Sequence, residues 1–221
     1  MKKILYAITI LLSGVLLIGN ANAQVKETSL QEAVNEEISY FGNADNFNDE
    51  QTFNAYQTYV NKMKNSDISN YALSDDKVNV YIFRGSTCWH CLDEISWLTT
   101  QVAEYGKYFN VHTYEVWSNK DNSKLMNTVA KTLGESASGV PYTVIGKKTY
   151  SGFSETMGQE MINEIKSQYE TTDRYDVKNY VDMSTGTVIK EEKKSSAVIY
   201  VLLGIVLVAG IGVVIYMGKS K

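Results

Sequence analysis

VNVYIFRGSTCWHC, residues 78–91, joins a hydrophobic strand pattern to a pair of cysteines. Residues 78–83 form a short apolar run rich in β-formers, which predicts a buried strand. The turn GSTC follows, and apolar residues then recur at helical spacing from about residue 89 to 109. The sequence therefore places Cys88 and Cys91, the only cysteines of the chain, at the start of a helix that follows a buried strand.

The same alternation of helix and strand patterns continues outside this stretch. Downstream, the spacing predicts a strand at 111–117, a helix at 124–134, two short strands at 141–146 and 148–153, and a last helix at 154–170. Strands that alternate with helices favour a mainly parallel sheet, to which the final hairpin adds an antiparallel part. The expected fold class is α/β, with a mixed sheet flanked by helices.

One amphipathic helix precedes the cysteine stretch, within residues 46–65. Asn48 is its preferred N-cap over Asp49, because Gln51 lies three residues after Asn48, as a capping box requires. Trp97 and Trp117 are expected to be core aromatic residues.

This order of elements resembles the thioredoxin superfamily over residues 46–170. The likeness depends on the strand that enters a C-x-x-C at a helix start, on Val140 and Pro141 at the start of a strand, and on Ser-Gly-Phe at 151–153 before the last helix. The resemblance implies a thioredoxin-like fold and thiol–disulfide exchange.

Disulfide exchange requires one accessible thiolate. A helix N-terminus lowers the pKa of a thiol, so Cys88 is the expected nucleophile and Cys91, one turn further in, the resolving thiol. Trp89 and His90 lie between them, and a histidine there is expected to stabilise the thiolate and make the disulfide more oxidising. Disulfide isomerases and Dsb-type oxidants also carry His before the second cysteine, whereas thioredoxins carry Pro, so the resemblance favours an oxidant or isomerase.

The resemblance also assigns roles away from the cysteines. It implies that Pro141, the only proline, is cis and that the backbone of Val140 pairs with an extended substrate segment. The sequence departs from the family at Ile82, where many members carry a buried acid that helps to deprotonate the second cysteine. The proton of Cys91 is therefore expected to go to water, to His90 or to an acid that the sequence does not identify.

Other uses of a C-x-x-C pair fit the sequence less well. A haem site would need His after the second cysteine, where Leu92 stands. A structural zinc site needs four ligands, and the only cysteines and histidines of the chain are Cys88, Cys91, His90 and His112. A structural disulfide across so short a gap removes little chain entropy. No cofactor is expected.

Apolar segments at both ends predict export and membrane attachment. Residues 1–23 have the two lysines, the uncharged apolar run and the Ala-Asn-Ala site of a signal peptide, with cleavage expected after Ala23. An uncleaved anchor is the alternative. Residues 197–217 carry no charge and are long enough to cross a hydrocarbon core of about 30 Å.

The remaining segments complete the predicted organisation: an N-terminal extension at 24–45, a polar stalk at 171–196 and a cytoplasmic stub at 218–221. The chain is then a single-pass protein of the cell membrane with its thioredoxin-like domain outside. Its net charge of −4 argues against nucleic acid as a partner. The expected partners are thiols and disulfides of exported proteins, a membrane redox partner, and lipid around 197–217.

Three functions are compatible with these features. The first is a thiol–disulfide oxidoreductase that acts on exported proteins, as an oxidant or isomerase rather than a reductase. The second is a thioredoxin-fold accessory protein dedicated to one exported peptide, similar to bacteriocin accessory proteins. The third is a binding module in which Cys88 and Cys91 form a passive disulfide.

Overall fold

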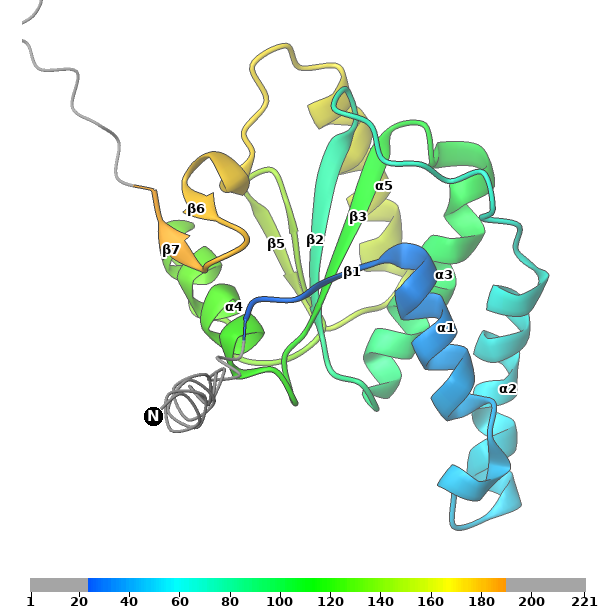
Figure 1. Ribbon diagram of the computed structural model, residues 1–221. Coiled ribbons are helices and arrows are strands. Elements are labelled where there is room, and N and C mark those ends of the chain that lie inside the picture. Colours follow the sequence, from blue (N-terminus) through cyan, green and yellow to red (C-terminus); the bar gives the residue numbers. More distant parts are fainter. Residues whose placement is uncertain (1–23, 190–221) are drawn as a thin grey trace, which may run out of the picture.

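The computed structural model describes residues 24–189 (Figure 1). The expected signal peptide at 1–23 and membrane span at 197–217 lie outside the described residues. None of the helices between residues 24 and 189 combines the length and hydrophobicity that a membrane crossing requires.

Five α-helices and seven strands make up the described part of the chain. The helices are α1 (Leu30–Phe41), α2 (Glu50–Asn65), α3 (Trp89–Tyr105), α4 (Lys120–Thr132) and α5 (Glu155–Tyr169), with short 3₁₀ turns η1 (Ala44–Asn46) and η2 (Val177–Asn179). The strands are β1 (Glu27–Ser29), β2 (Val78–Arg84), β3 (Phe109–Glu115), β4 (Tyr142–Ile145), β5 (Lys148–Ser151), β6 (Val181–Asp182) and β7 (Thr187–Val188). Every helix and strand predicted between residues 46 and 170 is present, with ends shifted by a few residues.

The main sheet is mixed, in the order β1-β3-β2-β4-β5. This confirms an α/β fold whose mixed sheet is flanked by helices. Only β2 and β3 pair in parallel, while the β1–β3, β2–β4 and β4–β5 pairs are antiparallel. The prediction of a mainly parallel sheet is therefore wrong. The connection from β3 to β4, residues 116–141, is long enough to bring the chain back in either direction, so alternation alone does not set the strand direction.

Strand β2 shows how the two faces of the sheet are built. Its alternate residues Val78, Val80 and Ile82 pack into one core with α1, α2, α3 and α5. Tyr81 and Phe83 point to the other face, where α4 and the segment after α5 cover a second core (Figure 1). Because β2 lies between β3 and β4 and is buried along its whole length, its C-terminal end is held rigidly where the cysteine turn begins.

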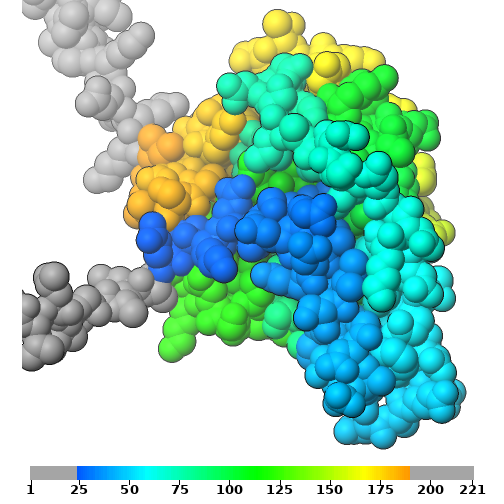
Figure 2. All heavy atoms as spheres, turned by 45° about the vertical axis from the view of Figure 1, so that its right-hand side comes forward, coloured from blue at the N-terminus to red at the C-terminus, as the bar shows by residue number. Residues whose placement is uncertain are grey.

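Segments on both sides of residues 46–170 pack onto the same sheet. Strand β1 pairs with β3, and α1 packs against α2 and α3. Figure 2 shows the N-terminal residues, in blue, lying against α2, in cyan. After α5, Val177 and Val181 are buried in the second core, and β6 pairs with β7. Residues 24–45 and 171–189 thus share their cores with the domain between them.

The N-cap of α2 is Asp49, so the preference for Asn48 is wrong. Asp49 immediately precedes the first helical residue and has extended backbone angles. Its Oδ1 accepts a hydrogen bond from the Thr52 N–H at 2.7 Å, and its Oδ2 accepts one from the Thr52 hydroxyl at 2.8 Å. A carboxylate at this position satisfies a free N–H and also complements the positive end of the helix dipole.

Candidate functional site

Cys88 is the N-cap of α3, directly after the turn that leaves β2. The turn is closed by the Cys88 N–H, which donates to the Gly85 carbonyl at 3.2 Å. The Cys88 Sγ in turn accepts from the Cys91 N–H at 3.3 Å. A sulfur atom therefore occupies the place where a helix N-terminus best stabilises a negative charge.

The two thiols lie together but have opposite environments. A hydrogen bond from the Cys91 side chain, helped by the backbone N–H groups of Cys91 and His90, lowers the pKa of Cys88 to about 7. Burial, followed by the hydrogen bond and the charge of Cys88, raises the pKa of Cys91 well above its usual range. Cys91 is fully enclosed, whereas Cys88 keeps 8% of its surface exposed. At neutral pH Cys88 is therefore partly ionised to the thiolate, while the enclosed Cys91 stays a thiol.

The Val140–Pro141 segment lies against Cys88. The peptide bond between the two residues is cis, and the Val140 carbonyl oxygen is 3.7 Å from the Cys88 Sγ, as an acceptor for its S–H. The Pro141 carbonyl accepts from the Gly152 N–H at 2.8 Å, which fixes the start of β4. Residues far apart in the sequence thus meet at one sulfur atom.

Two exposed tryptophans lie beside the cysteine turn. Trp89 is 46% exposed, and its ring stacks on that of His90 with 3.5 Å between centroids. Trp117 is 56% exposed, so the prediction of a core residue is wrong for it, while Trp97 is buried as predicted. A Cβ on Gly85 would come within 2.4 Å of the Trp117 ring. The indole therefore covers the bare backbone of the turn instead of entering the core.

His90 approaches the thiolate through its backbone. The His90 N–H helps to lower the pKa of Cys88, and the imidazole is turned toward Trp89. Its Nδ1 is buried and has no hydrogen-bond partner among residues 24–189. Stabilisation of the thiolate by the imidazole stays a prediction.

A buried acid that the sequence did not identify lies behind the cysteines. Glu94 is fully enclosed on α3, three residues after Cys91, and its Oε1 accepts a hydrogen bond from the Thr143 hydroxyl at 2.7 Å. Thr143 pairs with Ile82 in the sheet. The signal was present in the sequence: Glu94 lies at helical spacing between Cys91 and Leu98, on the apolar face of α3, where a charged residue is unusual.

A second buried acid comes from the N-terminal segment. Glu37 on α1 is enclosed with Arg84, the last residue of β2, whose Nη1 donates to the Glu37 Oε1 at 3.2 Å. The Arg84 Nη2 is paired with Glu36. Burial raises the pKa of Glu37 to about 8, although Arg84 opposes the shift. This cluster fixes α1 to the end of β2, four residues before Cys88.

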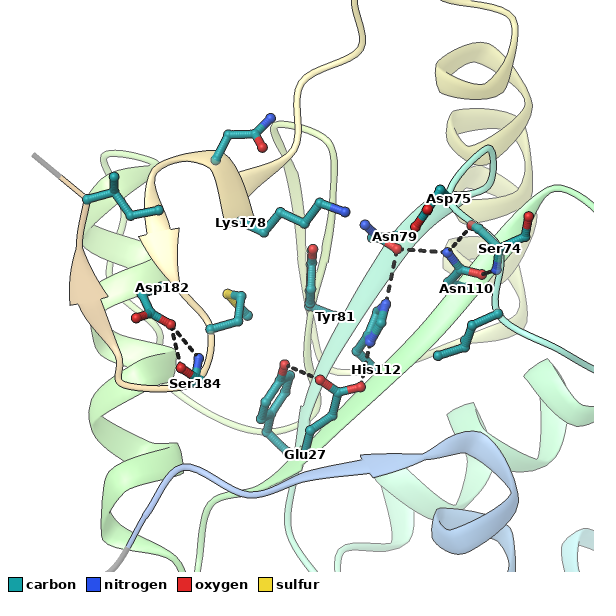
Figure 3. Close-up of a pocket in the computed structure, with 15 residues that line it drawn as sticks. Glu27, Ser74, Asp75, Asn79, Tyr81, Asn110, His112, Lys178, Asp182 and Ser184 are labelled. Carbon is teal, nitrogen blue, oxygen red and sulfur yellow. Dashed lines mark hydrogen bonds and ion pairs between the residues drawn. The ribbon is translucent and has the colours of Figure 1, made fainter. Parts of the chain in front are cut away.

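A separate hollow of about 900 Å³ lies on the other face of the sheet (Figure 3). Its polar lining groups bind one another: His112 contacts the Glu27 Oε1 at 2.6 Å and the Asn79 Oδ1 at 3.0 Å, and Asn110 donates to Asn79 at 2.9 Å. Within the described part of the chain, no three His, Cys, Asp or Glu side chains are grouped as metal ligands. Among residues 24–189, the buried carboxyl oxygens without a hydrogen-bond partner belong to Glu94 and Glu37, and neither residue lines this hollow.

The lowered pKa of Cys88 predicts the pH profile of its alkylation. A depressed pKa means that the thiolate forms at lower pH than in an ordinary cysteine, so the reaction with iodoacetamide should rise with pH and reach half its maximum near pH 7. Cys91 should stay unreactive across this range because it is buried and protonated. Mass spectrometry of the modified residue checks both; a half-maximum near the ordinary value of about 8.5 would contradict the helix-capped geometry.

Comparison with protein-family models, with curated proteins and with solved structures finds no match to this chain. The described residues form an α/β domain in which Cys88 and Cys91 lie close together, an arrangement consistent with a C-x-x-C redox site.

Proposed function

We propose that this chain is a membrane-tethered, extracytoplasmic thiol–disulfide oxidoreductase with a thioredoxin-like fold. One observation carries the proposal: the Cys88 sulfur caps α3 with a pKa of about 7, and Cys91 is held as a buried thiol behind it. A nucleophilic cysteine requires a lowered pKa, and a resolving cysteine is held nearby as a thiol until the mixed disulfide has formed. The tether and the location outside the cytoplasm come from the apolar segments at 1–23 and 197–217.

The exchange proceeds in two displacements. The Cys88 thiolate attacks one sulfur of a substrate disulfide, a mixed disulfide forms, and the first substrate thiolate leaves. Cys91 then loses its proton and attacks the Cys88 Sγ, so the Cys88–Cys91 disulfide forms and the second substrate thiolate leaves. Two electrons pass to the substrate. The reverse sequence oxidises a substrate dithiol, and isomerisation uses the mixed disulfide alone.

The direction of electron flow follows from the thiolate. A thiolate stabilised in the dithiol form favours the reduced protein and makes its disulfide more oxidising. A pKa of about 7 for Cys88 is close to that of thioredoxin and far above the value of about 3.5 of the strong oxidant DsbA. The pKa thus argues against a strong oxidant, and it is His90 before the second cysteine that favours an isomerase or a moderate oxidant over a reductase.

The surface around Cys88 suits an extended peptide. The Val140 backbone beside the sulfur offers a place for main-chain pairing, and Trp89 and Trp117 add exposed apolar surface on the cysteine side. The proposed substrates are cysteine-containing segments of exported proteins. A membrane redox partner would restore the disulfide after each oxidation, and lipid around 197–217 would hold the domain at the membrane.

The reduction potential of the Cys88–Cys91 pair tests the proposed direction. Equilibration of the full chain with glutathione buffers should give about −180 mV, as for protein disulfide isomerase. A value near thioredoxin's, about −270 mV, would instead indicate a reductase. Failure of the pair to exchange with glutathione would contradict the enzyme function and favour a binding module with a passive disulfide.

A further inference from the structure

The carboxyl group of Glu94 is placed to serve Cys91. Both side chains belong to α3 and are three residues apart, a spacing that puts neighbouring side chains about 5–6 Å apart on one helix face. Glu94 is completely buried. Its Oε1 accepts from Thr143, whereas its Oε2 has no hydrogen-bond partner within residues 24–189. A buried carboxyl oxygen without a partner is costly, and its retention calls for a reason.

The position of Thr143 shows where the carboxyl group of Glu94 lies relative to the sheet. Thr143 lies two residues after Pro141 on β4, directly opposite Ile82 on β2. The carboxyl group that it holds therefore lies between α3 and the sheet, close to the strand position where the sequence carries an apolar residue. An acid supplied by α3 thus takes the place that Ile82 leaves without one.

We propose that Glu94 takes up and returns the proton of Cys91 during disulfide exchange, and that the charge on Cys88 controls when it can do so. The inference rests on the oxidoreductase function proposed above, and names the proton acceptor of that same site.

Electrostatic coupling supplies the control. Burial, and then the charges of Cys88 and Asp93, raise the pKa of Glu94 to about 8, while the Thr143 hydrogen bond opposes the shift. With Cys88 as a thiolate, Glu94 therefore keeps its proton. Once Cys88 enters a mixed disulfide it carries no charge, the repulsion disappears, and Glu94 ionises more readily. Glu94 is thus more readily available as a base after the first displacement than before it.

Other charged groups face this region from the neighbouring elements. Asp93 on α3 is itself influenced by Lys62 of α2 and Glu155 of α5. From the N-terminal side, Glu37 of α1, paired with Arg84 of β2, feels the charge of Cys88. Of these acids, Glu94 is the one whose charge acts on Cys91.

The proton and electron balance is complete in both directions. On formation of the mixed disulfide, Glu94 releases its proton to water, which protonates the departing substrate thiolate. Cys91 then transfers its proton to the Glu94 carboxylate and attacks Cys88; the Cys88–substrate bond breaks and the second substrate thiolate leaves. In the reverse direction a substrate thiolate attacks the Cys88 Sγ of the disulfide, and the Cys91 thiolate leaves and takes the proton from Glu94. The second substrate thiol then gives its proton through water to Glu94 and attacks the substrate sulfur of the mixed disulfide, Cys88 leaves as a thiolate, and two electrons have passed from the substrate to the cysteine pair.

A two-step chemical probe separates the roles of the residues. Dithiobisnitrobenzoate releases one coloured thiolate when Cys88 attacks it and a second when Cys91 resolves the mixed disulfide. In the full-length protein, E94Q should leave the first release within about twofold and slow the second on the order of 100-fold, the usual range for loss of a general base. Glutamine preserves the shape and the contact with Thr143. E104Q, the same substitution at an exposed residue near the other end of α3, is the matched control and should resolve at the wild-type rate.

The outcomes distinguish this inference from the proposed function. An unchanged second release in E94Q would overturn the role of Glu94 while leaving the oxidoreductase intact. If the wild-type protein releases the first coloured thiolate but never the second, the proposed exchange function itself would be overturned. If E94Q folds poorly, infrared titration of the carboxyl stretch of Glu94 in the full chain still decides: its pKa should fall in C88S, which carries no thiolate, and an unchanged pKa would refute control by Cys88.

Discussion

Replacing Cys88 with serine should abolish disulfide exchange, because a hydroxyl group at a helix N-terminus stays protonated at neutral pH and does not attack a disulfide. Replacing Cys91 with serine should have a different result. The backbone N–H of residue 91 still donates to the Cys88 Sγ, so the first displacement continues, but no resolving thiol follows it. C91S should therefore accumulate mixed disulfides with its substrates, and the double variant should accumulate none.

The measurement is non-reducing electrophoresis of the full-length variants, with mass spectrometry of the trapped partners. Several exported proteins bound to C91S would support a general oxidoreductase. A single trapped peptide would support the dedicated accessory protein instead. Equal trapping by C88S and C91S would show that neither thiol is the specific nucleophile, which would contradict the geometry of the α3 N-terminus.

Removal of both carboxyl groups around Arg84 should be the most destabilising polar change in the domain. The Arg84 side chain is fully buried, and a guanidinium group cannot neutralise itself by losing a proton. Glu36 and Glu37 both contact it. In E36Q, the nearby Glu37 can ionise to compensate Arg84; in E37Q, Glu36 already does so. Only E36Q/E37Q leaves the buried charge without a counter-charge, at an expected cost of about 3–5 kcal/mol.

Removal of the arginine should be less harmful. In R84M, Glu36 turns to solvent and Glu37 can take up a proton, because burial already raises its pKa to about 8. The loss should be about 1–3 kcal/mol, mostly from an unsatisfied carboxyl group. Adding R84M to E36Q/E37Q should restore most of the stability.

Urea unfolding at neutral pH measures these differences in the free energy of unfolding. We expect the effects of E36Q and E37Q to be non-additive, with the double variant far worse than the sum of the two, since each acid compensates for loss of the other. Additive effects, or a larger loss in R84M than in E36Q/E37Q, would show that Arg84 is stabilised in some other way.

Local sequence patterns were sufficient for much of the fold. The apolar run at 78–83 and the helical spacing after it placed Cys88 at the start of α3, and Val140 and Pro141 at the entrance to β4. These features depend on neighbours in the chain, because hydrogen bonding and side-chain periodicity in one element are local. The direction in which two strands pair does not depend on neighbours in the chain. The mainly parallel sheet expected from the alternation of helices and strands is in fact largely antiparallel.

The exposed position of Trp117 could not be predicted from its neighbours in the sequence either. It follows from Gly85, a residue of a different strand connection, whose missing side chain leaves room for the indole ring. The contact between Glu37 and Arg84 is not local either: α1 brings Glu37 to Arg84 because β1 pairs with β3 and because α1 packs against α2 and α3.

GSTCWHC contains the proposed nucleophile, the proposed resolving thiol and the turn between β2 and α3, so the sequence alone was sufficient to propose the chemistry of this site. The sequence marks Glu94 as an unusual charged residue on the apolar face of a helix, but it does not assign to Glu94 the proposed role of proton acceptor. Glu94 is only a charged residue on a helix until α3 packs against β4, where Thr143 binds one carboxyl oxygen and burial raises the pKa of the group. Both the burial that shifts a pKa and the distances between charges on different elements are set when the elements pack together, and neither can be read along the chain.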